Sequence, residues 1–207
     1  MRLPRLALGS GLLCLAALGV IAPLSAQDLH PSRRPSPMGM ARTMVGDTYI
    51  RVVYSRPYER GRDNIFGTGE SGAVVPYGEV WRTGANEATE ITITGDVTVA
   101  GKPLAAGTYS LFTTPGPEQW KIHFNRELGL DGAGRFDEAT ETFTPIDVAA
   151  TDVLTVTVPS SPVEGEKVEQ LTIELEPTPG GADMVLRWIT TEVRVPMKVE
   201  GAASPSG

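Results

Sequence analysis

Apolar and polar residues alternate along most of the chain. The alternation recurs in six stretches, at residues 50–54, 91–99, 120–124, 154–158, 171–175 and 193–199. A period of two residues places apolar side chains on one face of an extended segment and polar side chains on the other. Val, Ile and Thr, which suit a pleated and half-buried surface, supply most of these positions. The pattern therefore predicts an all-β, antiparallel fold.

Turn-forming residues separate the predicted strands, as at Gly95-Asp96 and Pro115-Gly116-Pro117. Short strands at intervals of about ten residues are typical of a β-sandwich, with jelly-roll and immunoglobulin-like arrangements as alternatives. Residues 184–189 are apolar on both faces except at Arg187, which predicts a central strand. Pro196 predicts that the last strand lies at a sheet edge. Little helix is expected, with residues 126–130 and 137–141 as weak candidates.

The first 26 residues have the pattern of a secretory signal peptide. Arg2 and Arg5 precede an apolar run at residues 6–20, and small residues before Gln27 provide a cleavage site. The run is shorter than the roughly 20 apolar residues that a membrane-spanning helix needs. We therefore expect an exported protein, periplasmic or secreted, with no stable membrane insertion after cleavage.

The rest of the chain divides into three parts. Residues 27–44 are rich in Pro, Ser and Arg and lack an apolar period, which predicts a flexible leader. Residues 45–200 are of the right length for a single domain that contains the predicted β-sandwich. Residues 201–207 are small and polar, which predicts a disordered tail.

Charge and cysteine content narrow the classes of function. The chain has 18 basic and 25 acidic residues, a net charge of −7, which argues against a nucleic-acid-binding protein. Cleavage after Ala26 removes two of the 18 basic residues and none of the 25 acidic ones, so the net charge becomes −9. The same cleavage removes Cys14, the only cysteine. We therefore expect no disulfide, no metal site and no cofactor.

One long segment, residues 55–89, breaks the alternation. It is rich in glycine and contains four arginines of an otherwise acidic protein, Arg56, Arg60, Arg62 and Arg82. Loops of this length within a compact domain are usually functional. Guanidinium groups bind carboxylates and other anions through paired hydrogen bonds. The segment is therefore the first place to look for a binding site.

The stretch Trp81–Thr89 of this segment allows two interpretations. It combines an aromatic ring, a cation, an amide, a carboxylate and hydroxyl groups within nine residues. In one interpretation, a small polar or anionic ligand or a glycan binds a non-catalytic site. The candidate residues are Tyr54, Arg56, Arg62, Trp81, Arg82, Asn86 and Glu87. In the other, Arg82 pairs with Glu87 or Glu79 in a closed network that fixes the loop.

Two further classes of function stay open. A hydrolase of cell-envelope material would use Glu87 or Glu79 as general acid or base, with Arg82 stabilising negative charge. A structural or protein-interaction module would expose an apolar patch. His123 is the only histidine placed to serve a nucleophile, and its polar strand position predicts an exposed or partly packed side chain.

Several motifs are similar to those of one protein family. They are Tyr54-Ser55-Arg56-Pro57, Gly61-Arg62, Ile65-Phe66-Gly67, Val75-Pro76-Tyr77-Gly78, the stretch from Trp81 to Thr89, and Gly107-Thr108-Tyr109-Ser110-Leu111-Phe112. Together they resemble the domain-of-unknown-function family 2911. The resemblance covers nearly all of the chain after residue 44 and implies an exported bacterial protein rich in β-strands. It implies no activity, because none is assigned to the family.

Overall fold

The computed structural model describes residue 30 and residues 33–201. The expected signal peptide, residues 1–26, and all but the first residue of the expected tail lie outside the described residues. Nine strands carry most of the fold: β1 (Met38–Val45), β2 (Thr48–Ser55), β5 (Thr89–Ile93), β8 (Gly107–Thr114), β9 (Gln119–Asn125), β12 (Asp152–Pro162), β13 (Val168–Thr178), β14 (Gly181–Ile189) and β15 (Thr191–Val199). The all-β, antiparallel prediction is confirmed.

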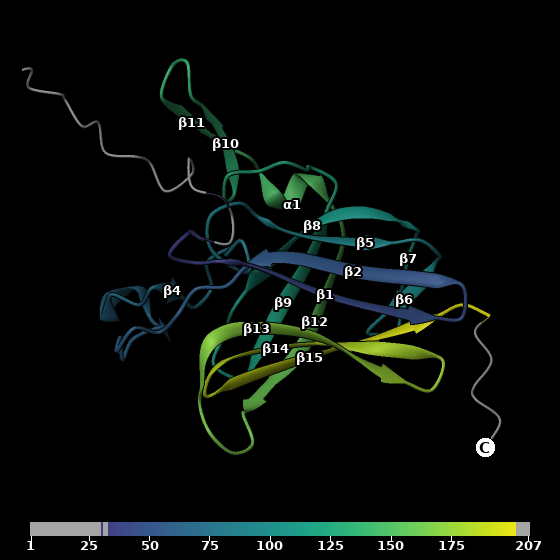
Figure 1. The fold of residues 1–207 in the computed structure, drawn as a ribbon. Coiled ribbons are helices and arrows are strands. Elements are labelled where there is room, and N and C mark those ends of the chain that lie inside the picture. The colour runs from purple at the N-terminus through teal and green to yellow at the C-terminus, as the bar shows by residue number, and fades with distance from the viewer. Residues whose placement is uncertain (1–29, 31–32, 202–207) are drawn as a thin grey trace, which may run out of the picture.

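The nine strands are hydrogen-bonded in the order β1-β2-β5-β8-β9-β12-β15-β14-β13. The long strand β12 joins the two halves, because its first part pairs with β9 and residues 160–162 pair with β15. The short strands β6 (Val97–Val99) and β7 (Lys102–Leu104) extend the second half beside β15. The sheet curls back on itself, so that β1 and β2 face β13, β14 and β15 across the core (Figure 1).

The two ends of the sheet, β1 and β13, lie close together, and a seam of hydrogen bonds joins β13 to Tyr54 of β2 and to the segment that follows β2. The Tyr54 hydroxyl accepts a hydrogen bond from the Ile173 amide at 2.8 Å and donates one to the Ile173 carbonyl at 3.2 Å. Beyond β2 the chain continues along β13, where the Leu171 amide donates to the Pro57 carbonyl at 2.9 Å. Backbone groups at the edge of β13 are thus satisfied by a side chain and by an irregular segment instead of a regular strand.

The buried residues of the core come from the strands that the alternation predicts. Ile50, Ile91, Ile122, Val156 and Ile173 are all at most 2% exposed. The stretch predicted to be central, residues 184–189, belongs to β14, which lies between β13 and β15. This prediction is confirmed.

The prediction that Pro196 marks an edge strand is wrong. Its strand, β15, lies between β14 on one side and β12 and β6 on the other. Residues 191–193 pair with β12 and residues 197–199 pair with β6, so Pro196 lies in the gap between the two neighbours. A missing N–H group is tolerated there without loss of a ladder hydrogen bond.

The structure also moves the start of the domain. Residues 38–44, assigned to the flexible leader by sequence, form β1, which pairs with β2 along its whole length. Met38, Met40 and Met44 are exposed, whereas the inward positions include Ala41 and Gly39. A Cβ at Gly39 would lie 2.5 Å from the Arg56 side chain. Because small residues face inward and methionines face outward, the apolar positions of β1 are on its exposed face. The sequence pattern therefore does not predict a strand here.

The remaining elements are short. They are β3 (Phe66–Gly67), the 3-10 turn η3 (Gly69–Ser71), β4 (Val75–Pro76), the hairpin of β10 (Gly134–Asp137) and β11 (Thr142–Pro145), and the helix α1 (Val148–Thr151). The weak helix candidates at residues 126–130 and 137–141 are wrong, since neither is helical. The helix α1 forms instead, and the Asp147 side chain caps it by accepting from the Ala150 amide. Within residues 33–201, no helix is long and apolar enough to cross a bilayer.

Residues 56–80 cover one end of the domain, near the label β4 in Figure 1. Phe66 anchors this segment among three tryptophans, with ring centroids 6.1 Å from Trp81, 5.1 Å from Trp120 and 5.6 Å from Trp188. We call these four rings the aromatic cluster. Edge-to-face packing of this kind adds stability beyond the buried area. The irregular segment is therefore held by its own apolar anchor.

Candidate functional site

Residues 81–89 form a tight loop, and hydrogen bonds at both of its ends hold it in place. Trp81 and Thr113 of β8 exchange two backbone hydrogen bonds, of 2.7 and 2.9 Å. The Thr89 hydroxyl donates to the Thr83 carbonyl at 2.9 Å. Thr83 and Asn86 both have a φ of 56°, a left-handed conformation that a β-branched residue such as threonine rarely adopts. Strained backbone held by its surroundings occurs often at ligand-binding sites.

Asn86 ties this loop to the rest of the domain. Its side-chain nitrogen donates to the Ser36 carbonyl and to the Ser55 hydroxyl, both at 3.1 Å. The loop also passes close to β2, since a Cβ at Gly84 would lie 2.8 Å from the Ser55 carbonyl oxygen. Asn86 therefore positions the loop, and its donor nitrogen is already engaged.

Arg82 differs from the other candidate residues because its side chain makes no hydrogen bond or ion pair with residue 30 or residues 33–201. Its Nε atom is buried and has no partner. A Cβ at Gly132 would lie 3.0 Å from Arg82 Nη1, so the guanidinium packs against the loop that contains Gly132. Burial lowers the pKa of Arg82, and the nearby charge of Glu87 acts in the opposite direction. A half-buried guanidinium whose buried Nε has no partner is costly, and a bound anion would offset that cost.

Arg82 lines a cavity of about 480 Å³ together with Arg60 and Arg62. We call it the arginine cavity. No aspartate or glutamate lines it, although the chain as a whole has a net charge of −7. Trp81 and Trp188 also line it, and their rings stack with centroids 5.9 Å apart and an interplanar angle of 17°. The cavity thus combines concentrated positive charge with an aromatic wall.

The other two arginines of the cavity are held by backbone carbonyls. Arg62 donates to the carbonyls of Glu59 and Tyr58, at 2.8 and 2.6 Å. Arg60 donates to the Pro35 carbonyl at 2.7 Å. Because a carbonyl oxygen carries no net charge, these bonds orient the guanidinium groups without cancelling their charge. Their positive charge therefore remains available to a ligand.

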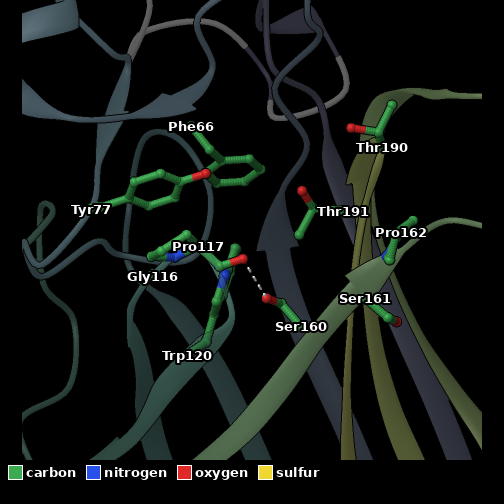
Figure 2. A pocket seen from close by; sticks show the side chains of 10 residues that line it. All are labelled: Phe66, Tyr77, Gly116, Pro117, Trp120, Ser160, Ser161, Pro162, Thr190 and Thr191. Atoms are coloured by element: carbon green, nitrogen blue, oxygen red, sulfur yellow. Dashed lines mark hydrogen bonds between the residues drawn. The ribbon is translucent and has the colours of Figure 1, made fainter.

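A second, smaller pocket of about 210 Å³ lies on the other side of the aromatic cluster. Figure 2 shows the rings of Phe66 and Tyr77 on one side of it and Trp120 below them. Hydroxyl-bearing residues complete its wall: Ser160, Ser161, Thr190 and Thr191. The Ser160 hydroxyl is engaged with the Pro117 carbonyl at 3.3 Å. This pocket is uncharged, so the two hollows differ in the ligands that they suit.

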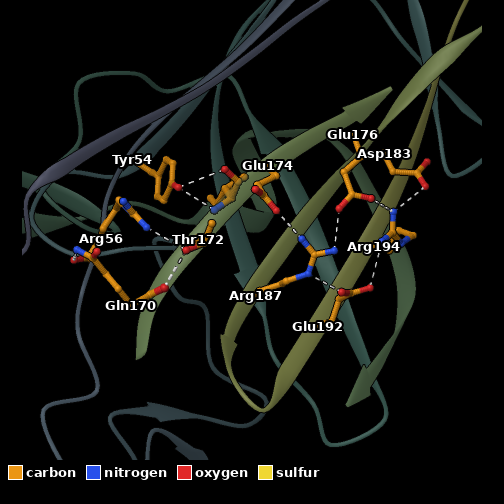
Figure 3. Close-up of polar contacts among 11 residues, drawn as sticks. Tyr54, Arg56, Gln170, Thr172, Glu174, Glu176, Asp183, Arg187, Glu192 and Arg194 are labelled. Carbon is orange, nitrogen blue, oxygen red and sulfur yellow. Dashed lines mark hydrogen bonds and ion pairs between the residues drawn. The ribbon is translucent and has the colours of Figure 1, made fainter. Parts of the chain in front are cut away.

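Two candidate residues, Tyr54 and Arg56, belong to the seam instead of the arginine cavity. Figure 3 shows both beside β13. Arg56 donates to the Leu171 carbonyl at 3.1 Å and to the Thr172 hydroxyl at 3.0 Å. Tyr54 is buried, and burial raises the pKa of its hydroxyl. Their hydrogen-bonding groups are engaged within the protein, so they hold the sheet ends together.

Glu87 and Glu79 also lie outside the arginine cavity. Glu87 is 47% exposed and forms an ion pair of 2.5 Å with Arg34. Burial raises the pKa of Glu87, but the hydrogen bond and charge of Arg34 lower it more, so the net shift is downward. Glu79 is exposed and lies near Gly69. The structure does not bring the two carboxylates together around Arg82.

The sequence profile of the family described as Protein of unknown function (DUF2911) matches residues 36–197. The chain belongs to the DUF2911 family. The resemblance inferred from the motifs is thus confirmed. No match is found among curated proteins or among solved structures.

The matched region of this DUF2911 protein contains the whole of the seam and the arginine cavity. Of the residues that line the cavity, the sequence candidates include Arg62, Trp81 and Arg82 but not Arg60, Tyr58 or Trp188. Arg60 is one of the four arginines noted in the irregular segment, and Trp188 lies on the apolar face of a strand, where it is a core residue, 2% exposed, as well as part of the cavity wall. Within residues 33–201, no group of three or more His, Cys, Asp or Glu side chains is placed to hold a metal ion.

His123 is more deeply buried than its polar strand position predicted. It is 8% exposed and lies on the outer face of the sheet, opposite the core. A small second core of Ala88, Phe112, Leu130 and Val148 forms on the sheet near α1. His123 is paired with Phe112 across β8 and β9, so the second core lies beside it. The second core thus covers His123, although the alternation of its strand predicts that this side chain faces solvent.

Proposed function

We propose that this DUF2911 protein is exported and that its arginine cavity is a non-catalytic site that binds a small anionic organic ligand. The observation that carries the proposal is the buried and unpaired Nε of Arg82 in a cavity lined by three arginines and no carboxylate. A ligand carboxylate or phosphate would accept hydrogen bonds from a guanidinium that the protein leaves unsatisfied. Export rests on the N-terminal sequence pattern.

The rest of the cavity supports an organic anion more than a bare inorganic ion. Its volume of about 480 Å³ is within the usual range for small-molecule sites. Trp81 and Trp188 supply an apolar wall on which a ring or sugar face can pack. Rings of the aromatic cluster line both hollows, so the arginine cavity has an apolar surface beside its positive charges. An acidic sugar, with a ring face and a carboxylate, is a chemical class that suits this combination.

Geometry gives less support to the other functions. A hydrolase based on Glu87 or Glu79 would need these carboxylates at the cavity, and neither lines it. An interaction module would use exposed apolar side chains such as Met38, Met40 and Met44 on β1. Those methionines lie on the outer face of β1 and do not explain the unpaired arginine.

The proposal is tested by anion binding to an Arg82→Met variant, which removes the charge but keeps an apolar side chain. The matched control is Arg135→Met, since Arg135 is 52% exposed, pairs with Glu127 and lies outside the cavity. The probes are inorganic phosphate, citrate, benzoate and glucuronate in a thermal-shift titration. We expect at least one probe to stabilise the wild type and Arg135→Met, and to bind Arg82→Met about tenfold or more weakly, about 1.4 kcal/mol.

The unliganded Arg82→Met variant should melt within about 3 °C of the wild type, because no internal hydrogen bond is lost. Equal stabilisation of wild type and Arg82→Met by every probe that binds would contradict the proposal. So would a large fall in the melting temperature of unliganded Arg82→Met, which would indicate the closed network.

A further inference from the structure

We propose that Thr114, His123 and Asp152 form a second site, a nucleophilic relay that hydrolyses small carboxylic esters. The three residues come from adjacent strands: Thr114 ends β8, His123 lies within β9 and Asp152 begins β12. The site is on the outer face of the sheet and shares no residue with the arginine cavity.

The hydrogen bonds run in one line through the imidazole. The Nδ1 atom of His123 is 2.7 Å from Asp152 Oδ2, and Nε2 is 2.9 Å from the Thr114 hydroxyl oxygen. The carboxylate can only accept, so the network assigns the proton of neutral His123 to Nδ1. Nε2 is then an acceptor, and the Thr114 hydroxyl donates to it. This is the arrangement in which a histidine can remove a proton from a nucleophilic hydroxyl.

Asp152 is itself held in position from two sides. Asn125, which is fully buried, donates to Asp152 Oδ1 at 2.8 Å. The Thr155 hydroxyl donates to Oδ2 at 3.1 Å. Both carboxylate oxygens are thus engaged, and Oδ2 is directed at the imidazole. Asp152 is therefore a positioning residue that orients His123.

Thr114 also lines a surface hollow of about 470 Å³ that could admit a substrate. Lys121 is paired with Thr114 across β8 and β9, so the two side chains share a face, and both line the hollow. The ammonium group of Lys121 provides a positive charge near the ester oxygen that becomes negative during attack. Tyr77, Gly78 and Gly116 line the same hollow. The nucleophile is half-buried at the hollow, while His123 lies behind it with 8% exposure.

The reaction balances with water as the second substrate. Thr114 Oγ1 bonds to the ester carbonyl carbon while its proton moves to His123 Nε2. The C–O bond to the alcohol then breaks, and the alcohol leaves with the proton from Nε2. Water attacks the acyl-threonine, its proton passes through Nε2 back to Thr114, and the carboxylic acid is released.

The test combines covalent labelling with ester hydrolysis by the purified full chain. A fluorophosphonate would bond through phosphorus to Thr114 Oγ1 and release fluoride, and peptide mass spectrometry locates the adduct. Hydrolysis of p-nitrophenyl acetate gives the rate. Thr157→Val is the matched control, because Thr157 lies two residues beyond Thr155 on β12, is exposed and is opposite Lys121.

We expect the adduct on Thr114 in the wild type and in Thr157→Val. Thr114→Val should lose the adduct and about 100-fold in hydrolysis rate, whereas Thr114→Ser keeps a nucleophile and should still be labelled at residue 114. Asp152→Asn should lower the labelling rate about tenfold or more while remaining folded, as judged by its melting temperature. A purely structural network would move the melting temperature without placing an adduct on Thr114.

Three outcomes would each overturn the proposal. The first is an adduct on Tyr77 or Lys121 but not on Thr114. The second is a wild type that takes up no label. The third is a folded Thr114→Val variant that hydrolyses the ester as fast as the wild type.

Discussion

Two groups of arginines in this protein have opposite environments. In the arginine cavity, Arg60, Arg62 and Arg82 form no ion pair with any described residue, and no carboxylate lines the cavity. On the outer face of β13, β14 and β15, Arg187 and Arg194 are surrounded by four, as Figure 3 shows. We call this second group the arginine ladder; its carboxylates are Glu174, Glu176, Asp183 and Glu192. The charge of arginine is thus neutralised by carboxylates on one surface and is left without an ion-pair partner at the other.

In the arginine ladder, each guanidinium group is paired with several carboxylates. Arg187 forms ion pairs of 2.5 Å with Glu174, 2.7 Å with Glu176 and 2.6 Å with Glu192. Burial lowers the pKa of Arg187, but the bonds to Glu176 and Glu192 raise it more, so the net shift is upward. The pKa of Arg82 shifts downward. The comparison teaches that the partners of an arginine, more than its presence, separate a structural role from a binding role.

The largest effect on folding should come from breaking the ladder. Arg187→Met leaves three carboxylates close together without their shared cation. The pairs are partly exposed, so we expect a loss of about 1–2 kcal/mol in unfolding free energy, which lowers the melting temperature by about 3–8 °C. Urea unfolding measures the change. Arg82→Met is the comparison variant, and an equal loss in both would remove the distinction between the two groups.

A smaller effect should follow from acid. Arg194 and Arg187 lower the pKa of Glu176 below its ordinary value of 4.5. A carboxyl group whose pKa is depressed on folding contributes stability that is present above its unfolded pKa and is lost as the pH falls through its folded pKa. Unfolding free energy should therefore decrease as the pH falls below about 4.5.

The matched variant for this acid effect is Glu176→Gln. Its unfolding free energy should depend less steeply on pH in the same range, since the titrating group is gone. If the unfolding free energy of the variant and of the wild type changed with pH to the same extent, Glu176 would not be the source of the acid effect. Arg82→Met should change the slope less than Glu176→Gln does, because Arg82 forms no ion pair within the described part of the chain and is the weakest of the influences that lower the pKa of Glu87.

The smallest effect should come from Glu87, which lowers the positive potential at Arg82 without binding it directly. In Glu87→Gln, an anion in the arginine cavity should bind about two- to threefold more tightly, about 0.5 kcal/mol. The control is Glu138→Gln, an exposed position on the hairpin of β10 and β11 with the same change in net charge. Isothermal titration with the best anion measures both. Weaker binding in Glu87→Gln would indicate that Glu87 contacts the ligand.

The main strands could be predicted because their alternation is strong. Residues 171–175 give both the buried positions of β13 and the outward Glu174 from the sequence alone. The ladder could not be predicted, since its pairs depend on the register of β13 with β14, which sets Glu174 against Val185 and Glu176 against Asp183. The alternation of one strand fixes which face each residue lies on, but the residue that faces it depends on the partner strand and the turn between them.

The candidate site was predicted in part. The segment at residues 55–89 drew attention to Arg82 and Trp81, which do line the same cavity. Tyr54 and Arg56 could not be separated from them, because their role depends on contact with β13, more than 100 residues away in sequence. Thr114 gave no signal at all, since a hydroxyl at a strand end looks like any solvated residue until β9 and β12 place His123 and Asp152 beside it.

The Tyr54 hydroxyl has a consequence for self-association. An uncovered outer strand offers free N–H and C=O groups to the same strand of another molecule, a common route to aggregates and swapped dimers. In this protein one phenol oxygen occupies both groups of Ile173. Tyr54 and Ile173 are both buried, so loss of this oxygen would leave the N–H and C=O groups of Ile173 without a partner at the edge of β13. The satisfaction of this strand edge within the molecule therefore depends on a single oxygen atom, independently of ligand binding.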